Sequence, residues 1–74
     1  MNAIMEKREK IETAIDDFIR GGIYSKEIHD GLENDIDEFR RYAIQDKGQL
    51  PPLADRWGDD MKKKLNDFAS KKDT

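Results

Sequence analysis

The sequence predicts an all-α domain folded as a small up-down-up three-helix bundle, and two features of the chain carry this prediction. Apolar residues recur at steps of three and four in each third of the chain, which places them on one face of a helix. Two strong helix breaks, Gly21-Gly22 and residues 48–52, separate the thirds. Because the connections are short, neighbouring helices should run antiparallel. The expected helices span residues 3–20, 25–46 and 52–71.

The first expected helix has an apolar stripe with one gap. Its apolar face consists of Ile4, Ile11, Ala14, Ile15, Phe18 and Ile19. Inside the gap stand Lys7 and Arg8, whose long stems can lie along apolar surface while their charges stay in water. We expect residues 1–10 to pack loosely and fray. The alternative is that Arg8 lies against Asp35, beside the stripe of the second helix.

The second expected helix has clear signals at both ends. Its apolar stripe consists of Ile28, Leu32, Ile36, Phe39 and Ala43. Ser25 can cap the N-terminus, and Glu27 in the first turn meets the positive end of the helix dipole. Arg40 and Arg41 lie toward the other end, where positive charge is favourable.

The third expected helix begins at a proline pair. Its apolar stripe consists of Leu53, Trp57, Met61, Leu65 and Phe68. Gly48 suits a left-handed cap for the preceding helix, and Pro51-Pro52 cannot extend that helix but is tolerated in a first turn. Gly58 costs about 1 kcal/mol inside a helix, which a close approach of a neighbouring helix would explain.

The length of the chain limits its stability. With 74 residues and no cysteine it forms one small core, with neither a disulfide nor a thiolate metal site. A core of this size supplies little net stability. The main alternative to the bundle is therefore a long helical hairpin whose third helix packs on another chain.

Composition narrows the class of protein. Charged residues make up 42% of the chain and hydrophobic ones 35%, close to the balance of disordered chains, but the regular apolar spacing indicates a folded domain. No apolar run is long enough to span a bilayer, and the N-terminus lacks the apolar centre of a secretory signal. We expect a cytoplasmic protein without a membrane segment.

Acidic residues are concentrated in the second expected helix. Residues 27–38 carry six acidic side chains and no lysine or arginine, and the formal charge of residues 25–46 is −4 within a chain of −3. With the apolar stripe facing inward, a helical wheel places these polar residues on the outer face: Glu27, Asp30, Asn34, Asp37 and Glu38. Like charges this close repel one another. A docking site for a basic protein surface would explain why they are present.

The leading hypothesis is a small non-enzymatic binding protein that docks on a larger, basic-surfaced protein through this face and regulates or inhibits it. Two interpretations of the face compete with it: a solvated surface without a partner, and a mimic of phosphates that blocks a nucleic-acid-binding protein. A third alternative is a structural or assembly protein that self-associates, for example as a homodimer, through apolar residues. The candidates for that contact are Ile23, Tyr24 and Ile44, the first two as either an exposed tip or a staple over the second helix.

The sequence has no motif for catalysis, a cofactor or a metal. The single histidine, His29, and Glu33 four residues later give two ligands, which do not close a metal site. We therefore expect no enzyme activity, no cofactor and no metal. The run Lys62-Lys63-Lys64 spreads around a helix that also carries aspartates, so direct nucleic-acid binding is not expected.

Overall fold

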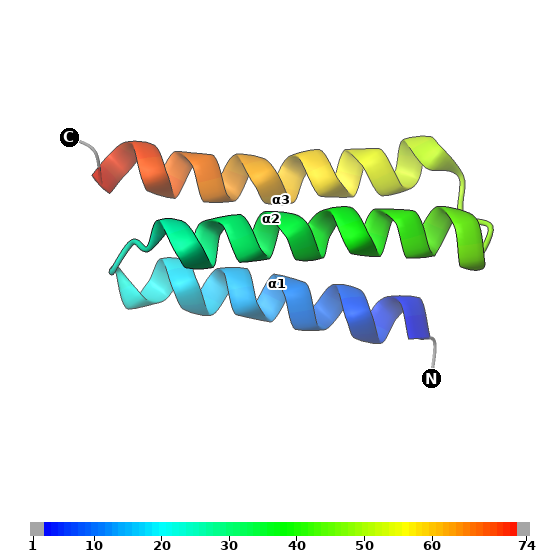
Figure 1. The fold of residues 1–74 in the computed structure, drawn as a ribbon, viewed down its shortest axis with the longest axis horizontal. Coiled ribbons are helices and arrows are strands. Elements are labelled where there is room, and N and C mark those ends of the chain that lie inside the picture. The colour runs from blue at the N-terminus through cyan, green and yellow to red at the C-terminus, as the bar shows by residue number, and fades with distance from the viewer. Residues whose placement is uncertain (1–2, 73–74) are drawn as a thin grey trace.

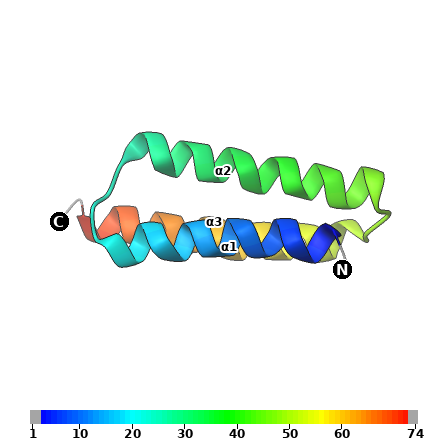
Figure 2. The same cartoon turned by 90° about the horizontal axis from the view of Figure 1, so that it is seen from below.

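The computed structural model describes residues 3–72 and confirms the up-down-up bundle of three helices, with no strand in that part of the chain. Neighbouring helices run antiparallel, so α1 and α3 point the same way (Figure 1). In the perpendicular view α1 and α3 overlap while α2 stands to one side, which gives the bundle a triangular cross-section (Figure 2). The elements are α1 (Ala3–Gly21), α2 (Lys26–Arg41), a π-helical turn η1 (Tyr42–Asp46) and α3 (Pro51–Lys72).

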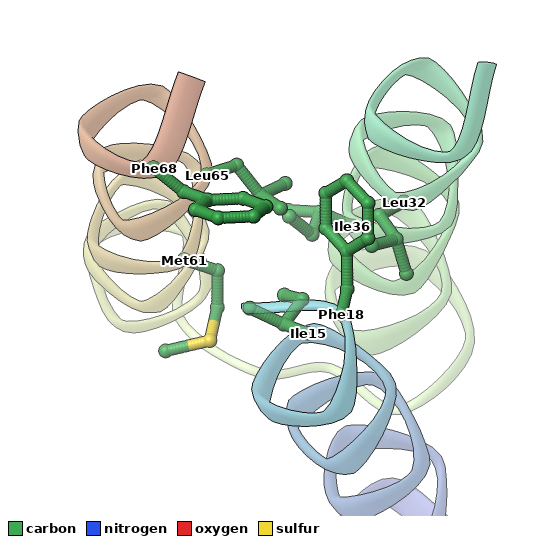
Figure 3. Close-up of a cluster of buried hydrophobic side chains, with 7 residues drawn as sticks. All are labelled: Ile15, Phe18, Leu32, Ile36, Met61, Leu65 and Phe68. Carbon is green, nitrogen blue, oxygen red and sulfur yellow. The ribbon is translucent and has the colours of Figure 1, made fainter. Parts of the chain in front are cut away.

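The core lies on the common axis of the bundle and draws on every helix. Its buried cluster consists of Ile15, Phe18, Leu32, Ile36, Met61, Leu65 and Phe68 (Figure 3). Phe18 and Phe68 meet edge to face, with ring centroids 5.1 Å apart. Because α3 contributes to the same core as α1 and α2, the bundle describes this chain and the helical-hairpin alternative does not.

Three residues assigned to the apolar stripes are exposed. Ile28 is 50% exposed and Leu53 is 57% exposed, while their neighbours His29 and Ala54 are buried. Ile28 lies in the first turn of α2, at the end of the bundle where α1 ends at Gly21. At the other end of the bundle, α1 presents the charged Arg8 toward Leu53 instead of an apolar residue. Ala14, also assigned to a stripe, is exposed.

The contact between Arg8 and Asp35, which was the alternative to fraying, is not formed. Arg8 lies 3.7 Å from Glu12 on its own helix. Lys7 reaches the η1 turn instead, with its amino group 4.6 Å from the centre of the Tyr42 ring. Residues 1–2 fall outside the described part of the chain, and the expected fraying of residues 1–10 stays a prediction.

The glycines in the two connections adopt the backbone conformation that the sequence pattern predicts. Gly22 and Gly48 have φ values of 74° and 67°, in the left-handed region that favours glycine. The N–H of Gly22 donates to the carbonyl of Ile19 at 3.1 Å, and that of Gln49 donates to the carbonyl of Ala43 at 2.9 Å. These bonds satisfy carbonyl groups that the helix ends leave free.

Candidate protein-binding surface

The acidic residues lie on a helix with a capped N-terminus. Ser25 caps α2, because its hydroxyl oxygen accepts from the N–H of Ile28 at 3.5 Å. On the side of α2 away from the core, four of the predicted residues are exposed to solvent: Glu27, Asp30, Asn34 and Glu38. The structure thus presents these four residues together on one helix surface, which we call the outer face of α2.

The fifth predicted residue, Asp37, belongs to the contact between α2 and α3. Its carboxylate accepts from Lys62 at 2.9 Å and from Arg40 at 3.3 Å. Arg40 in turn pairs with Asp55 on α3, and its Nε lies 3.1 Å from that carboxylate. The hydrogen bond from Lys62 lowers the pKa of Asp37, and the hydrogen bond to Asp55 raises the pKa of Arg40. Asp37 therefore contributes to the contact between α2 and α3, while 42% of its side chain stays exposed.

The remaining carboxylates of α2 differ from Asp37 in this respect. Within residues 3–72, Glu27, Asp30 and Glu38 form no ion pair, and neither does Asp35 on the side toward α1. Two basic side chains, Arg40 and Lys62, are engaged at the α2–α3 contact. The outer face consequently keeps its negative charge, which attracts basic molecules from solution.

His29 has a structural role that the sequence reasoning missed. It is only 6% exposed, and Tyr24 donates its hydroxyl hydrogen to His29 Nδ1 at 2.7 Å. Glu33 Oε1 lies 3.1 Å from His29 Nε2. A carboxylate oxygen accepts from an N–H at Nε2, and in that tautomer of the ring Nδ1 accepts from the phenol. Both ring nitrogens are satisfied, as buried polar atoms should be.

The spacing around Ser25 could have revealed this role. Tyr24 precedes the capping residue and His29 is the fourth residue inside the helix, which are the two positions that a hydrophobic staple joins. Their rings contact each other with centroids 5.6 Å apart. Because Ile28 is apolar, the periodicity assigns Ile28, and not the neighbouring His29, to the buried stripe.

The three apolar candidates, Ile23, Tyr24 and Ile44, differ in how far they are buried. Tyr24 is half-buried and packs against Phe18 and Phe68, with centroid distances of 5.9 and 5.7 Å. Ile44 is half-buried as well. Only Ile23, which is 81% exposed, forms an apolar tip. Tyr24 therefore makes the staple and Ile23 the tip, where the sequence left both outcomes open for the pair.

A groove runs between α1 and the side of α2 that faces it. It encloses about 480 Å³ and has an apolar floor formed by Ile11, Phe39 and Tyr42. Asp35 and Glu38 line the α2 wall. The opposite wall consists of the α1 residues Lys7 and Lys10. The groove thus adjoins the outer face of α2 and shares Glu38 with it.

The described residues were also examined for a metal site and for a membrane-spanning helix. In residues 3–72, no three His, Cys, Asp or Glu side chains come together as a metal site requires, and no helix there is long and apolar enough to cross a membrane. Comparison of the chain with protein-family models, curated proteins and solved structures gave no match. The chemistry of the α2 surface is therefore the basis on which a function can be proposed.

Proposed function

We propose that this domain is a small non-enzymatic binding protein that docks on a larger, basic-surfaced protein through the outer face of α2 and regulates or inhibits it. The observation that supports this is the division of the α2 carboxylates into two sets. Asp37 is neutralised by Arg40 and Lys62, whereas Glu27, Asp30 and Glu38 are exposed and unpaired among the described residues. Exposed charges of one sign on a rigid helix speed association with a partner of opposite charge.

The alternatives have less surface to act through. Self-association by the apolar candidates would depend on Ile23, because Tyr24 packs against the core and Ile44 is half-buried. A phosphate mimic needs a dense row of charges, and the pairing of Asp37 removes one charge from the row. A basic protein surface requires neither a large apolar patch nor a regular phosphate spacing.

The test is a double charge reversal on the outer face, Asp30→Lys with Glu38→Lys. Asp37 is left unchanged because its reversal would also break the α2–α3 contact. The matched control carries the same change of charge on the exposed side of α3, Asp59→Lys with Asp67→Lys. Tagged proteins are used to capture partners from a lysate of the source cells at about 0.05 M and 0.5 M salt, because screening weakens exposed charge pairs.

We expect the wild-type protein and the α3 control to retain the same proteins at low salt, and the α2 variant to lose them. High salt should release them from the wild type. If the α2 variant retains the same proteins as the wild type, the outer face is only a solvated surface. If the α3 control loses them equally, capture depends on net charge and not on this face.

A further inference from the structure

Large apolar side chains gather at the end of the bundle where α1 and α3 begin. Met5 is 57% exposed, Leu50 is 66% exposed and Leu53 is 57% exposed. They belong to the same end because α1 and α3 run in the same direction and start there (Figure 1). Exposed apolar groups that gather in one place mark interaction sites on soluble proteins.

The spacing along α1 and α3 places these side chains across from each other. Trp57 on α3 donates its indole N–H to Glu12 on α1 at 2.8 Å, which ties the two helices together. One turn nearer the end, Arg8 and Leu53 line a hollow of about 230 Å³ together with Trp57. The residues three positions earlier on each segment are the two remaining exposed apolar residues. We call this surface the α1–α3 groove, and it consists of Met5, Arg8, Leu50, Leu53 and Trp57.

The backbone holds the α3 side of the groove in place. The carbonyl oxygen of Leu50 accepts from the N–H of Leu53 at 3.0 Å and from that of Ala54 at 3.4 Å. Between the two leucines, Pro51 and Pro52 have φ angles that their rings fix. The leucines are thus presented by a rigid turn, so that covering them costs little conformational freedom.

Arg8 gives the groove a positive charge that is only weakly engaged. Its Nε lies 3.7 Å from Oε1 of Glu12, and this oxygen already accepts from Trp57. Among residues 3–72, the terminal nitrogens of Arg8 have no hydrogen-bond or ion-pair partner. A guanidinium presents five N–H donors and can bind a carboxylate through two parallel hydrogen bonds. The groove therefore contains an available carboxylate-binding group beside its apolar side chains.

The charges around the groove favour an acidic occupant near Leu53. Arg8 lies against Leu53 in the hollow, and the exposed Arg56 follows Leu53 by three residues on α3. Arg56 forms no ion pair within the described part of the chain. The acidic Glu9 and Asp60 lie farther along α1 and α3, where they would repel an acid. An acidic group of the occupant is thus directed to the two arginines.

A second copy of the chain does not fit the groove. In a two-fold dimer the same patch of both subunits would meet, which would bring the two Arg8 guanidinium groups toward each other. A stable dimer also buries about 800 Å² on each partner, far more than three partly exposed side chains provide. A short segment that carries its own acidic group matches a surface of this size.

We propose that the α1–α3 groove binds a short acidic amphipathic helix of a partner protein. The apolar side chains of this helix cover Met5, Leu50 and Leu53, and a carboxylate one turn away pairs with Arg8. Amphipathic helices dock by apolar anchors at this spacing. Because α1 and α3 stand on the side away from the outer face of α2 (Figure 2), the inference goes beyond the proposed function and does not rest on it.

The probe is a synthetic helical peptide of alanine, leucine and glutamate with its leucines on one face. It is compared with a shuffled peptide of the same composition and with a peptide in which lysine replaces every glutamate. Trp57 is the single tryptophan of the chain and lines the groove, so its fluorescence reports binding there. The titrations are made at about 0.15 M salt, where charges more than about 8 Å apart are largely screened.

The first variant removes apolar surface from the groove by the double change Leu50→Gln with Leu53→Gln. Its matched control is Ile23→Gln with Ile28→Gln, which removes an exposed apolar pair at the other end of the bundle. All four side chains are at least half exposed, so both variants should fold. Thermal unfolding of each variant checks this.

The second variant removes the positive charge by Arg8→Gln and leaves the apolar side chains in place. The bond between Glu12 and Trp57 does not involve Arg8, so the fluorescent reporter stays where it is. The matched control is Arg20→Gln, the same change at an exposed position near the other end of α1.

We expect the wild type to bind the acidic amphipathic peptide at least about tenfold more tightly than the shuffled one. The lysine peptide should leave the fluorescence of Trp57 unchanged. The leucine variant and Arg8→Gln should each lose at least about tenfold in affinity, while both controls keep the wild-type value.

Three results would each overturn the inference: no binding by the wild type, an equal response of Trp57 to the acidic and lysine peptides, or unchanged affinity in the leucine variant or in Arg8→Gln. None of them bears on docking through the outer face of α2, which the reversal of Asp30 and Glu38 tests separately.

Discussion

Replacement of Ile36 by alanine is expected to destabilise the domain by about 3 kcal/mol, within the range of about 2–5 kcal/mol for buried isoleucine. Ile36 is completely buried and belongs to the cluster that joins the three helices. Domains have only about 0.05–0.15 kcal/mol of stability per residue. A loss of this size should therefore leave a substantial fraction of this short chain unfolded, which urea titration followed by circular dichroism would measure.

The matched control is Ile28→Ala, the same chemical change eight residues earlier on the same helix. Ile28 is half exposed, and alanine is the better helix former, so the change should cost less than about 1 kcal/mol. The sequence pattern alone assigns both residues to the same stripe. Equal costs for the two variants would show that the inward face of α2 is not the one described.

The second large effect is expected from Gly58→Leu. The new Cβ would stand 2.6 Å from Cδ of Arg40, so the Arg40 side chain must shift and its pair with Asp55 is disturbed. The remaining carbons of leucine would then press on α2. Overpacking of this kind costs about 1–3 kcal/mol, more than the improved helix propensity of leucine recovers.

A double variant separates this contact from a general effect of the larger residue. In an Arg40→Ala background the stem is absent and the leucine has room. The cost of Gly58→Leu in that background should be smaller by at least about 1 kcal/mol, which is the coupling expected of residues in direct contact. Urea unfolding of the four proteins gives the value, and strictly additive costs would contradict the contact.

The architecture followed from the sequence because its signals are local and agree with one another. Periodicity places Ile15, Ile36 and Leu65 in the interior, and all three are fully buried. The glycine breaks correctly mark the turns, and Gly22 and Gly48 adopt the left-handed backbone that these breaks imply. Such signals need no knowledge of how the helices are placed relative to one another.

Features that depend on a neighbouring helix could not be predicted from the sequence. A helical wheel places Asp37 on the outer side of α2 but does not say on which side α3 lies, and α3 brings Lys62 to this carboxylate. Ile28 fits the apolar period, yet the core at that end is closed by Tyr24 and His29.

The most direct test of docking through α2 is an NMR titration of the isotope-labelled domain with a synthetic lysine-rich peptide at low salt. We expect the largest shifts at the backbone amides of residues 27–38, and little change at the outer α3 residues Arg56, Lys63 and Ser70. The same shifts should shrink when salt is raised, because exposed charges contribute to binding. Shifts that centre on α3 or on the Ile23 tip, and that persist at high salt, would contradict docking through the outer face of α2.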